Sequence, residues 1–199
     1  DFYFASACGI QLHGYRWEPE GTPKAVVQII HGIAEHVERY DHFARYLTGL
    51  GYLVVAEDHM GHGKSICEEV PQGYFAGGWD NAVEDCYHLL QTVKAEFPDT
   101  PYILFGHSMG SFLARSILIK HPDSGIKAAI ICGSAWMPGA VVQGGKLISG
   151  LLNRGDGARK PSELLQNVMF SGYDKRIEHP RTSCDWLTRD EEIVDTYMA

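Results

Sequence analysis

The sequence predicts an α/β fold with a mostly parallel sheet and helices on both faces. Between residues 25 and 135, short apolar runs rich in Val and Ile alternate with longer segments whose apolar residues recur at helical spacing. The runs are apolar at consecutive positions, which is typical of strands buried on both faces. Several end in loops that contain Gly, His or Ser, at the sheet edge where ligands bind in such folds.

The N-terminal half predicts a hairpin followed by two parallel strands. Residues 2–5 and 10–17 alternate apolar and polar side chains around a short turn, as an antiparallel pair at a sheet edge does. Residues 25–30 and 52–56 are short apolar runs that predict buried strands. Between them, apolar residues spaced three and four apart predict a helix over residues 40–50.

The next segments extend the same pattern. A glycine-rich loop at 57–65 precedes a long amphipathic helix at 79–97. Residues 102–106 predict a strand, and helical spacing follows over residues 109–120. Residues 127–132 are a last apolar run, which predicts another buried strand.

After residue 132 the pattern changes to helices alone. Residues 139–153 and 162–170 have helical character, and Thr188 with Glu191 forms a capping box expected to open a final helix.

Length and composition fit one domain with an insertion. The 199 residues are 45% apolar and 21% charged, as in ordinary globular proteins. We expect residues 1–135 to form the N-terminal part of the core and residues 136–199 to form a helical cap, or lid, over the strand ends.

Charge and cysteine content restrict the partners. The net charge is −8 and no basic block is present, so nucleic acid is not expected as a partner. The five cysteines are odd in number and widely spaced, which favours reduced thiols over a disulfide framework. No signal-peptide pattern or membrane-length apolar run is found, and we expect a cytoplasmic protein with at most peripheral membrane contact.

One pentapeptide contains a candidate nucleophile. Residues 106–110 read Gly-His-Ser-Met-Gly, a G-x-S-x-G pattern between a strand run and a helix, which predicts a sharp turn with Ser108 at its tip. Gly106 and Gly110 are expected there because side chains at these positions would collide with the neighbouring strand and helix. The N-terminus of the helix offers N–H groups to a developing oxyanion.

The histidines of two loops have simpler interpretations. We expect His107, inside the pentapeptide, to be a hydrogen-bonded core residue. His59 and His62 lie in the glycine-rich loop without a third ligand at suitable spacing, so we interpret them as structural and expect no metal and no cofactor.

Four stretches together resemble the monoacylglycerol lipase and lysophospholipase branch of the α/β-hydrolases, which is similar to the serine aminopeptidase S33 group. They are residues 31–36 (His-Gly-Ile-Ala-Glu-His) with Arg39-Tyr40, residues 58–65 (Asp-His-Met-Gly-His-Gly-Lys-Ser), residues 106–110, and the cap stretch 184–197. Arginine is usual in this family where the chain has Met60. The resemblance implies the α/β-hydrolase fold with a helical cap insertion.

The resemblance also implies roles for individual residues. Ser108 would be the nucleophile, and the backbone N–H groups of Ile33 and Met109 would form the oxyanion hole. The supporting groups would be Gly32, Glu35, His36 and His107. A local salt bridge on an exposed turn is the alternative interpretation of Glu35 and His36.

Ser108 needs a histidine base and a carboxylate that orients it. In the resembled family both follow the cap, after two further strands, so we expect a remainder of the hydrolase chain beyond Ala199 to complete the fold. Within the chain, His121 would lie ~20 Å from Ser108 at the far end of its helix. Asp174 and His179 have the right order but lie in the cap, and they remain an alternative.

The function expected from these features is hydrolysis of a single-acyl-chain lipid ester, a monoacylglycerol or lysophospholipid, through an acyl-enzyme on Ser108. The apolar cap would line an acyl tunnel or simply pack on the core. Arg154, Arg159 and Lys160 would meet a phosphate head group or form a solvated loop. The alternatives are an esterase or peptidase for small soluble substrates, and a catalytically incomplete fragment or binding protein.

Overall fold

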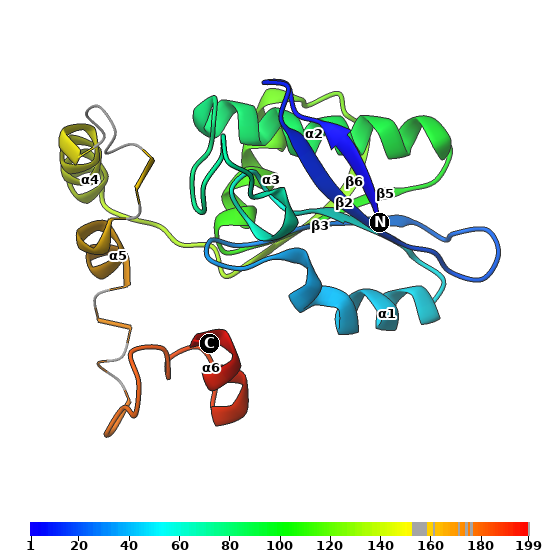
Figure 1. Cartoon of the computed structure of the whole chain (residues 1–199). Coiled ribbons are helices and arrows are strands. Elements are labelled where there is room, and N and C mark those ends of the chain that lie inside the picture. Colours follow the sequence, from blue (N-terminus) through cyan, green and yellow to red (C-terminus); the bar gives the residue numbers. More distant parts are fainter. Residues whose placement is uncertain (153–158, 161, 171, 174, 176, 199) are drawn as a thin grey trace. The chain divides into compact units, whose positions relative to one another are not determined.

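The computed structural model describes residues 1–152, 159–160, 162–170, 172–173, 175 and 177–198. It divides into two compact units, Asp1–Lys160 and Pro161–Ala199. The sheet and its covering helices lie in the first unit (Figure 1). The boundary predicted between a core at residues 1–135 and a cap at residues 136–199 stays a prediction.

Six strands form one sheet in the order β1-β2-β4-β3-β5-β6. Their bounds are Phe2–Ala5 (β1), Gln11–Trp17 (β2), Val26–Ile30 (β3), Leu53–Glu57 (β4), Tyr102–His107 (β5) and Ile126–Cys132 (β6). The predicted hairpin is confirmed, since β1 pairs antiparallel with β2, which in turn runs antiparallel to β4. The pairs β3·β4, β3·β5 and β5·β6 are parallel, so the predicted mostly parallel sheet is confirmed as well.

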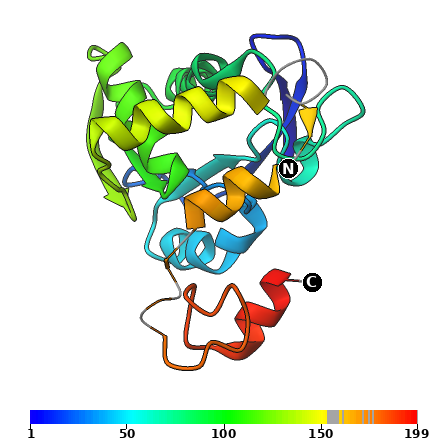
Figure 2. The ribbon, with the colours of Figure 1, turned by 90° about the vertical axis from the view of Figure 1, so that its left-hand side faces the viewer.

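Helices cover both faces of the sheet, as predicted. Helix α1 (Asp41–Gly49) lies on one face, and α2 (Gly78–Glu96) and α3 (Met109–Lys120) lie on the other (Figures 1 and 2). Short 3-10 turns, η1 (Val37–Tyr40) and η2 (Gly63–Ser65), lie in the connections after β3 and β4. Each face therefore has its own apolar core.

Successive residues of the central strands point into these two cores. In β4, Leu53 and Val55 pack with α2 and α3, whereas Val54 packs on the side of α1. This alternation explains the continuous apolar runs, because both faces of each strand are buried. Gln28, the polar residue of β3, donates to the Cys86 carbonyl and accepts from the Tyr102 hydroxyl, so its side chain is buried with partners.

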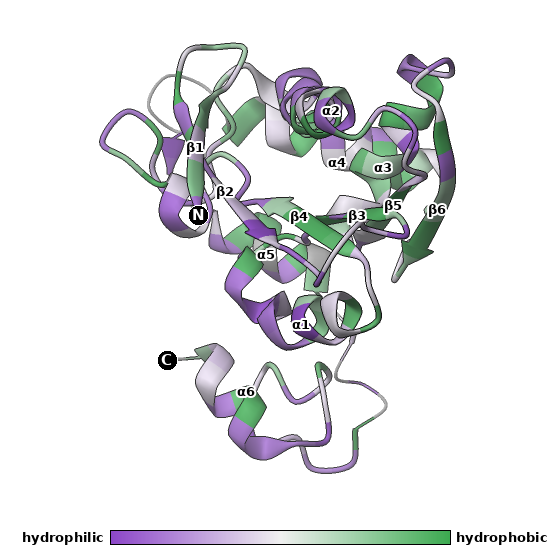
Figure 3. Ribbon diagram, turned by 90° about the vertical axis from the view of Figure 1, so that its right-hand side faces the viewer, coloured by the Kyte–Doolittle hydropathy of each residue, from purple (hydrophilic) through white to green (hydrophobic). Residues whose placement is uncertain are grey.

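The strand predicted at 127–132 is present, but the prediction that it is buried is wrong. β6 pairs with β5 on one side and is the last strand of the sheet in the described part of the chain (Figure 3). Ile130 is 50% exposed and Ile131 is 38% exposed. An apolar run indicates a strand that needs cover, and it does not say whether the neighbouring elements supply that cover.

Three helices follow β6 at the predicted places: α4 (Gly139–Leu152), α5 (Glu163–Phe170) and α6 (Glu191–Met198). The cap of α6 differs from the prediction. The Asp190 carboxylate accepts from the N–H groups of Glu192 and Ile193 and so caps the helix, whereas the Thr188 hydroxyl accepts from the Asp190 N–H. No helix of the described residues is long and apolar enough to cross a membrane.

Candidate active site

Three adjacent parallel strands place the predicted site residues at one edge of the sheet. β4, β3 and β5 are neighbours in that order, and they end next to Asp58, His31 and Ser108. Parallel strands end on the same side, so these loops come together although they are far apart in sequence.

Ser108 occupies the predicted sharp turn between β5 and α3. Its backbone has φ 51° and ψ −117°, a positive φ that non-glycine residues rarely adopt. A Cβ at Gly106 would collide with the Gly110 carbonyl oxygen in α3, and a Cβ at Gly110 would collide with the Ile30 carbonyl oxygen in β3. Glycine at these two positions lets the strand and the helix approach closely enough to form the turn.

The loop after β3 lies directly against Ser108. A Cβ built on Gly32 would lie 3.1 Å from the Ser108 Cβ and 2.6 Å from a Glu35 carboxylate oxygen. Met109 is the first residue of α3, so its N–H has no partner within the helix. For the Ile33 N–H no hydrogen-bond acceptor is found among the described residues. Their role as the two donors of an oxyanion hole stays a prediction.

A single carboxylate connects this loop to the serine turn. Glu35 is 8% exposed and accepts from the Gly32 N–H at 2.5 Å, Arg39 Nη1 at 2.9 Å and the Tyr40 hydroxyl at 2.8 Å. Its Oε1 also lies 3.0 Å from Nδ1 of His107, the residue before the serine. The sequence motif indicated Glu35, but it did not indicate that Tyr40 joins the same network.

These contacts keep Glu35 ionised. Burial by itself raises the pKa of the carboxyl group, but the hydrogen bonds from His107, Tyr40 and Gly32 outweigh it and lower the pKa below the ordinary value. Burial and the adjacent Glu35 charge raise the pKa of the Tyr40 hydroxyl, which therefore keeps its proton and remains a donor. The network is a charged acceptor surrounded by donors.

Two of the predicted supporting histidines differ in their contacts. His107 is hydrogen-bonded as expected, but the prediction of a core residue is wrong, because its side chain is 40% exposed. It is the last residue of β5, where it pairs with Cys132 of the exposed strand β6. His36 lies 4.0 Å from Glu38 and is 42% exposed.

The histidines of the other loops are engaged with backbone groups. His31 is fully buried, with Nδ1 2.7 Å from the Gly32 carbonyl and Nε2 accepting from the His59 N–H. Nδ1 of His62 lies 3.0 Å from the Met60 carbonyl, and burial followed by the nearby His59 lowers its pKa to about 4. His59 additionally lies near Glu57 and Cys86, a grouping that the sequence spacing did not reveal.

No base is hydrogen-bonded to the Ser108 hydroxyl within the residues that the structure describes. His121, directly after α3, stacks on Tyr87 with ring centroids 3.6 Å apart and pairs with Glu84 of α2. In the alternative pair, Asp174 lies outside the described residues, and His179 belongs to the second unit. That alternative stays a prediction.

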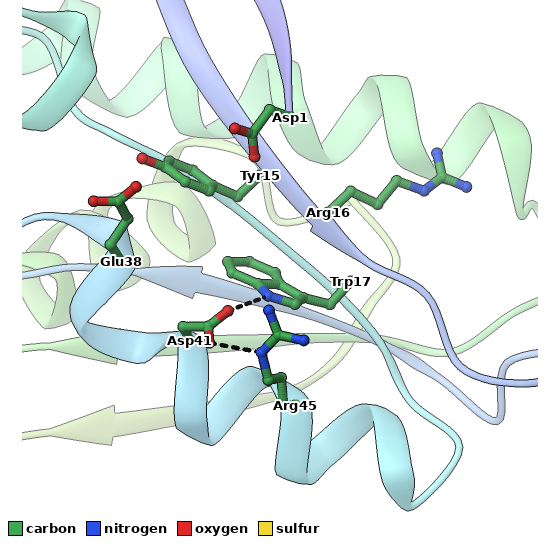
Figure 4. Close-up of a pocket in the computed structure, with 7 residues that line it drawn as sticks. All are labelled: Asp1, Tyr15, Arg16, Trp17, Glu38, Asp41 and Arg45. Atoms are coloured by element: carbon green, nitrogen blue, oxygen red, sulfur yellow. Dashed lines mark hydrogen bonds and ion pairs between the residues drawn. The ribbon is translucent and has the colours of Figure 1, made fainter.

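A separate cavity of about 600 Å³ lies between β2 and α1 (Figure 4). It is lined by Asp1, Tyr15, Arg16, Trp17, Glu38, Asp41 and Arg45. The Asp41 carboxylate there accepts from Trp17 Nε1 at 2.8 Å and from Arg45 Nε at 2.6 Å. The lining includes Glu38 of η1 but not Gly32, Ile33 or Ser108, so we do not assign the substrate to this cavity.

Comparison with known proteins identifies the family. Residues 21–199 match the family described as serine aminopeptidase, S33. The monoglyceride lipase of Mus musculus is 38% identical over 120 residues, which are 60% of this chain and 38% of that protein. The monoacylglycerol lipase of Mycolicibacterium smegmatis is 33% identical over 196 residues, covering 98% of this chain and 62% of that protein.

Solved structures agree with the fold. The carboxyl esterase of Bacillus coagulans, crystallised with glycerol, superposes with a TM-score of 0.88 at 30% identity, and the match covers 99% of this chain and 64% of that one. The α/β-hydrolase fold is therefore confirmed. The chain spans less than two thirds of the length of each of these three relatives.

Proposed function

The chain belongs to the serine aminopeptidase S33 family of α/β-hydrolases, and from this premise we propose that it carries the nucleophile of a carboxylic ester hydrolase. The observation that carries the proposal is the strained backbone of Ser108, with φ 51°, beside Gly32. Such a conformation costs on the order of 1–3 kcal/mol and persists where the surrounding structure enforces it, commonly at active sites.

In the proposed reaction the Ser108 hydroxyl oxygen attacks the ester carbonyl carbon. The carbonyl oxygen becomes an oxyanion, which accepts hydrogen bonds from the N–H groups of Ile33 and Met109, each worth on the order of 3–4 kcal/mol. The intermediate then expels the alcohol and leaves the acyl group on Ser108, and water hydrolyses this acyl-enzyme. A histidine base with a carboxylate partner, expected from the family resemblance, would remove the serine proton and pass it to the leaving alcohol oxygen.

Glu35 has a positioning role in this proposal. It holds the N–H of Gly32, directly before the proposed donor Ile33, and it also lies within hydrogen-bond distance of His107, directly before Ser108. One carboxylate thereby sets the distance between the nucleophile and an oxyanion donor. His36 is proposed to support the same loop from its exposed side.

We propose a single-acyl-chain lipid ester, a monoacylglycerol or lysophospholipid, as the substrate. The support is the similarity to two proteins named monoglyceride and monoacylglycerol lipase. The carboxyl esterase of Bacillus coagulans supports a second candidate, a small soluble ester. Hydrolysis of monooleoylglycerol, lysophosphatidylcholine and p-nitrophenyl acetate, compared by kcat/KM, separates these substrate classes.

Covalent labelling tests the nucleophile itself. In protein that includes the expected histidine base, a fluorophosphonate probe is expected to label Ser108, because the probe phosphonylates only an activated serine. Ser108→Ala is expected to abolish labelling, whereas Ser116→Ala, a change on the same helix α3, is expected to retain it. Failure of correctly folded protein to react would contradict the proposal and favour a binding role for the fold.

We also propose a cytoplasmic location. The support is that all five cysteines are free thiols, three of them exposed, as is usual in a reducing compartment. Thiol titration of protein taken directly from cell extracts would contradict this location if disulfides were found.

A further inference from the structure

A second buried carboxylate lies at the end of β4 without a hydrogen-bond partner. Glu57 is 2% exposed, and neither of its oxygens accepts a hydrogen bond from the described residues. His59 Nδ1 lies 3.7 Å from Glu57 Oε1, which is beyond hydrogen-bond range, and the Cys86 sulfur lies within 4.8 Å of the same carboxylate. A buried carboxylate without donors is costly, so a positive charge or a proton must accompany it.

The ring of His59 directs a nitrogen lone pair toward the Glu57 carboxylate. Its Nε2 lies 3.2 Å from the His31 carbonyl oxygen, which can only accept, so Nε2 carries the proton. In the neutral ring, Nδ1 is then an unprotonated nitrogen. It faces Glu57 Oε1 and also the Cys86 sulfur, 3.9 Å away.

Cys86 brings the third donor atom from helix α2. The thiol is fully buried, and the ligand atoms of Glu57, His59 and Cys86 all lie within 4.8 Å of one another. They come from a strand end, the loop that follows it and a helix packed on the same face. Tertiary packing alone assembles the three.

We propose that Glu57, His59 and Cys86 form a buried binding site for a divalent transition-metal ion of the zinc type. A carboxylate, an imidazole nitrogen and a thiolate are a donor set that suits zinc rather than magnesium or calcium. The hydrogen bond from His59 Nε2 to a backbone carbonyl is the contact that fixes the tautomer of metal-binding histidines. This site is independent of the proposed hydrolase activity.

The distances and charges fit this ion. Bond lengths of about 2.0–2.3 Å in a tetrahedron give ligand–ligand separations of roughly 3.3–3.6 Å. The observed 3.7 Å and 3.9 Å therefore need to shorten by a few tenths of an ångström. On binding, the Cys86 thiol releases its proton to solvent, and the dication balances one thiolate and one carboxylate. The ion would join β4, the loop that follows it and α2.

Cobalt substitution tests the site on the full chain. Chelator-treated protein titrated with Co²⁺ is expected to bind one equivalent, to show a thiolate-to-cobalt charge-transfer band, and to release about one proton per ion. Added Zn²⁺ is expected to remove the band. Absence of the band in folded wild-type protein would overturn the proposal, and the cluster would then hold a proton instead.

Variants assign the ligands. Cys86→Ser is expected to abolish the band, whereas Cys132→Ser, which changes an exposed thiol, is expected to keep it. Glu57→Gln has nearly the same shape and guards against loss of folding, which circular dichroism monitors. Its Co²⁺ affinity is expected to fall at least about tenfold, as even the loss of an outer partner causes. A band that persists in Cys86→Ser, or an unchanged affinity in folded Glu57→Gln, would contradict the assignment.

Discussion

Two buried glutamates at the ends of neighbouring strands have opposite surroundings. Glu35, in the loop after β3, accepts from Gly32, Arg39 and Tyr40 and contacts His107, whereas the described residues supply Glu57 with no donor. Both carboxylates are almost fully removed from water. The comparison teaches that burial alone does not define the role of a carboxylate, because Glu35 is surrounded by donors, whereas Glu57 has none among the described residues and is proposed to bind a cation.

The largest expected effect concerns the residue that the Glu35 network positions. Ser108→Ala removes the attacking atom and is expected to lower the kcat/KM for ester hydrolysis by at least about a thousandfold, as removal of a nucleophile does in serine hydrolases. The free energy of unfolding is expected to change little. Steady-state assays with monooleoylglycerol measure kcat/KM, and urea unfolding measures the free energy. A variant that retained activity would show that Ser108 is not the nucleophile and that the Glu35 network does not position a catalytic group.

Glu35→Gln is expected to have the next largest effect. The amide keeps the size of the side chain but has no negative charge. Its NH₂ group also replaces one carboxylate oxygen and would face the N–H and O–H groups that now donate to Glu35. Loss of such buried hydrogen bonds is expected to cost about 1–3 kcal/mol of unfolding free energy, measured by urea denaturation. The kcat is expected to fall more than the KM rises, because the oxyanion donor is displaced.

The matched change at the other glutamate sharpens the comparison. In metal-free protein, Glu57→Gln is expected to be neutral or stabilising, because neither Glu57 oxygen has a hydrogen bond from the described residues to lose. With Zn²⁺ present the same variant is expected to be less stable than the wild type. Equal destabilisation by both Gln variants in metal-free protein would contradict the contrast between the two sites.

The pH dependence of the unfolding free energy separates the contribution of the Glu35 charge from that of the shape of its side chain. The folded-state pKa of Glu35 lies below its ordinary value of 4.5, so the unfolded state binds more protons between the two values. The stabilisation is complete above pH 4.5 and is lost as the pH falls through the folded-state pKa. The stability difference between the wild type and Glu35→Gln is therefore expected to shrink on acidification. A difference that stayed constant would mean that shape, and not charge, is responsible.

The smallest effect on the unfolding free energy is expected for a change at His36, the residue after Glu35. His36 is 42% exposed, with only a long contact to Glu38 at 4.0 Å. His36→Ala is expected to change the unfolding free energy by less than about 0.5 kcal/mol, as most surface substitutions do. Thermal unfolding measures this change, and a cost similar to that of Glu35→Gln would show that His36 stabilises the loop as strongly as Glu35 does.

Much of the fold follows from local patterns in the sequence. The strand runs, the amphipathic helices and the Ser108 turn were all predictable, because periodicity and glycine placement act over a few neighbouring residues. The three strand ends could be brought together as well, because parallel strands end on the same side. The motif at residues 31–36 also indicated Glu35, although not the donors around it.

Other features depend on which surfaces meet in three dimensions. The exposure of β6 and the partly exposed ring of His107 depend on neighbouring elements, which the apolar run and the pentapeptide do not describe. The sequence by itself determined the serine at the sharp turn and the strands and helix around it. Only the tertiary structure decided that Cys86 of α2 meets His59 beside an unpaired Glu57, because the packing of a helix against a sheet brings together residues with no local pattern in common.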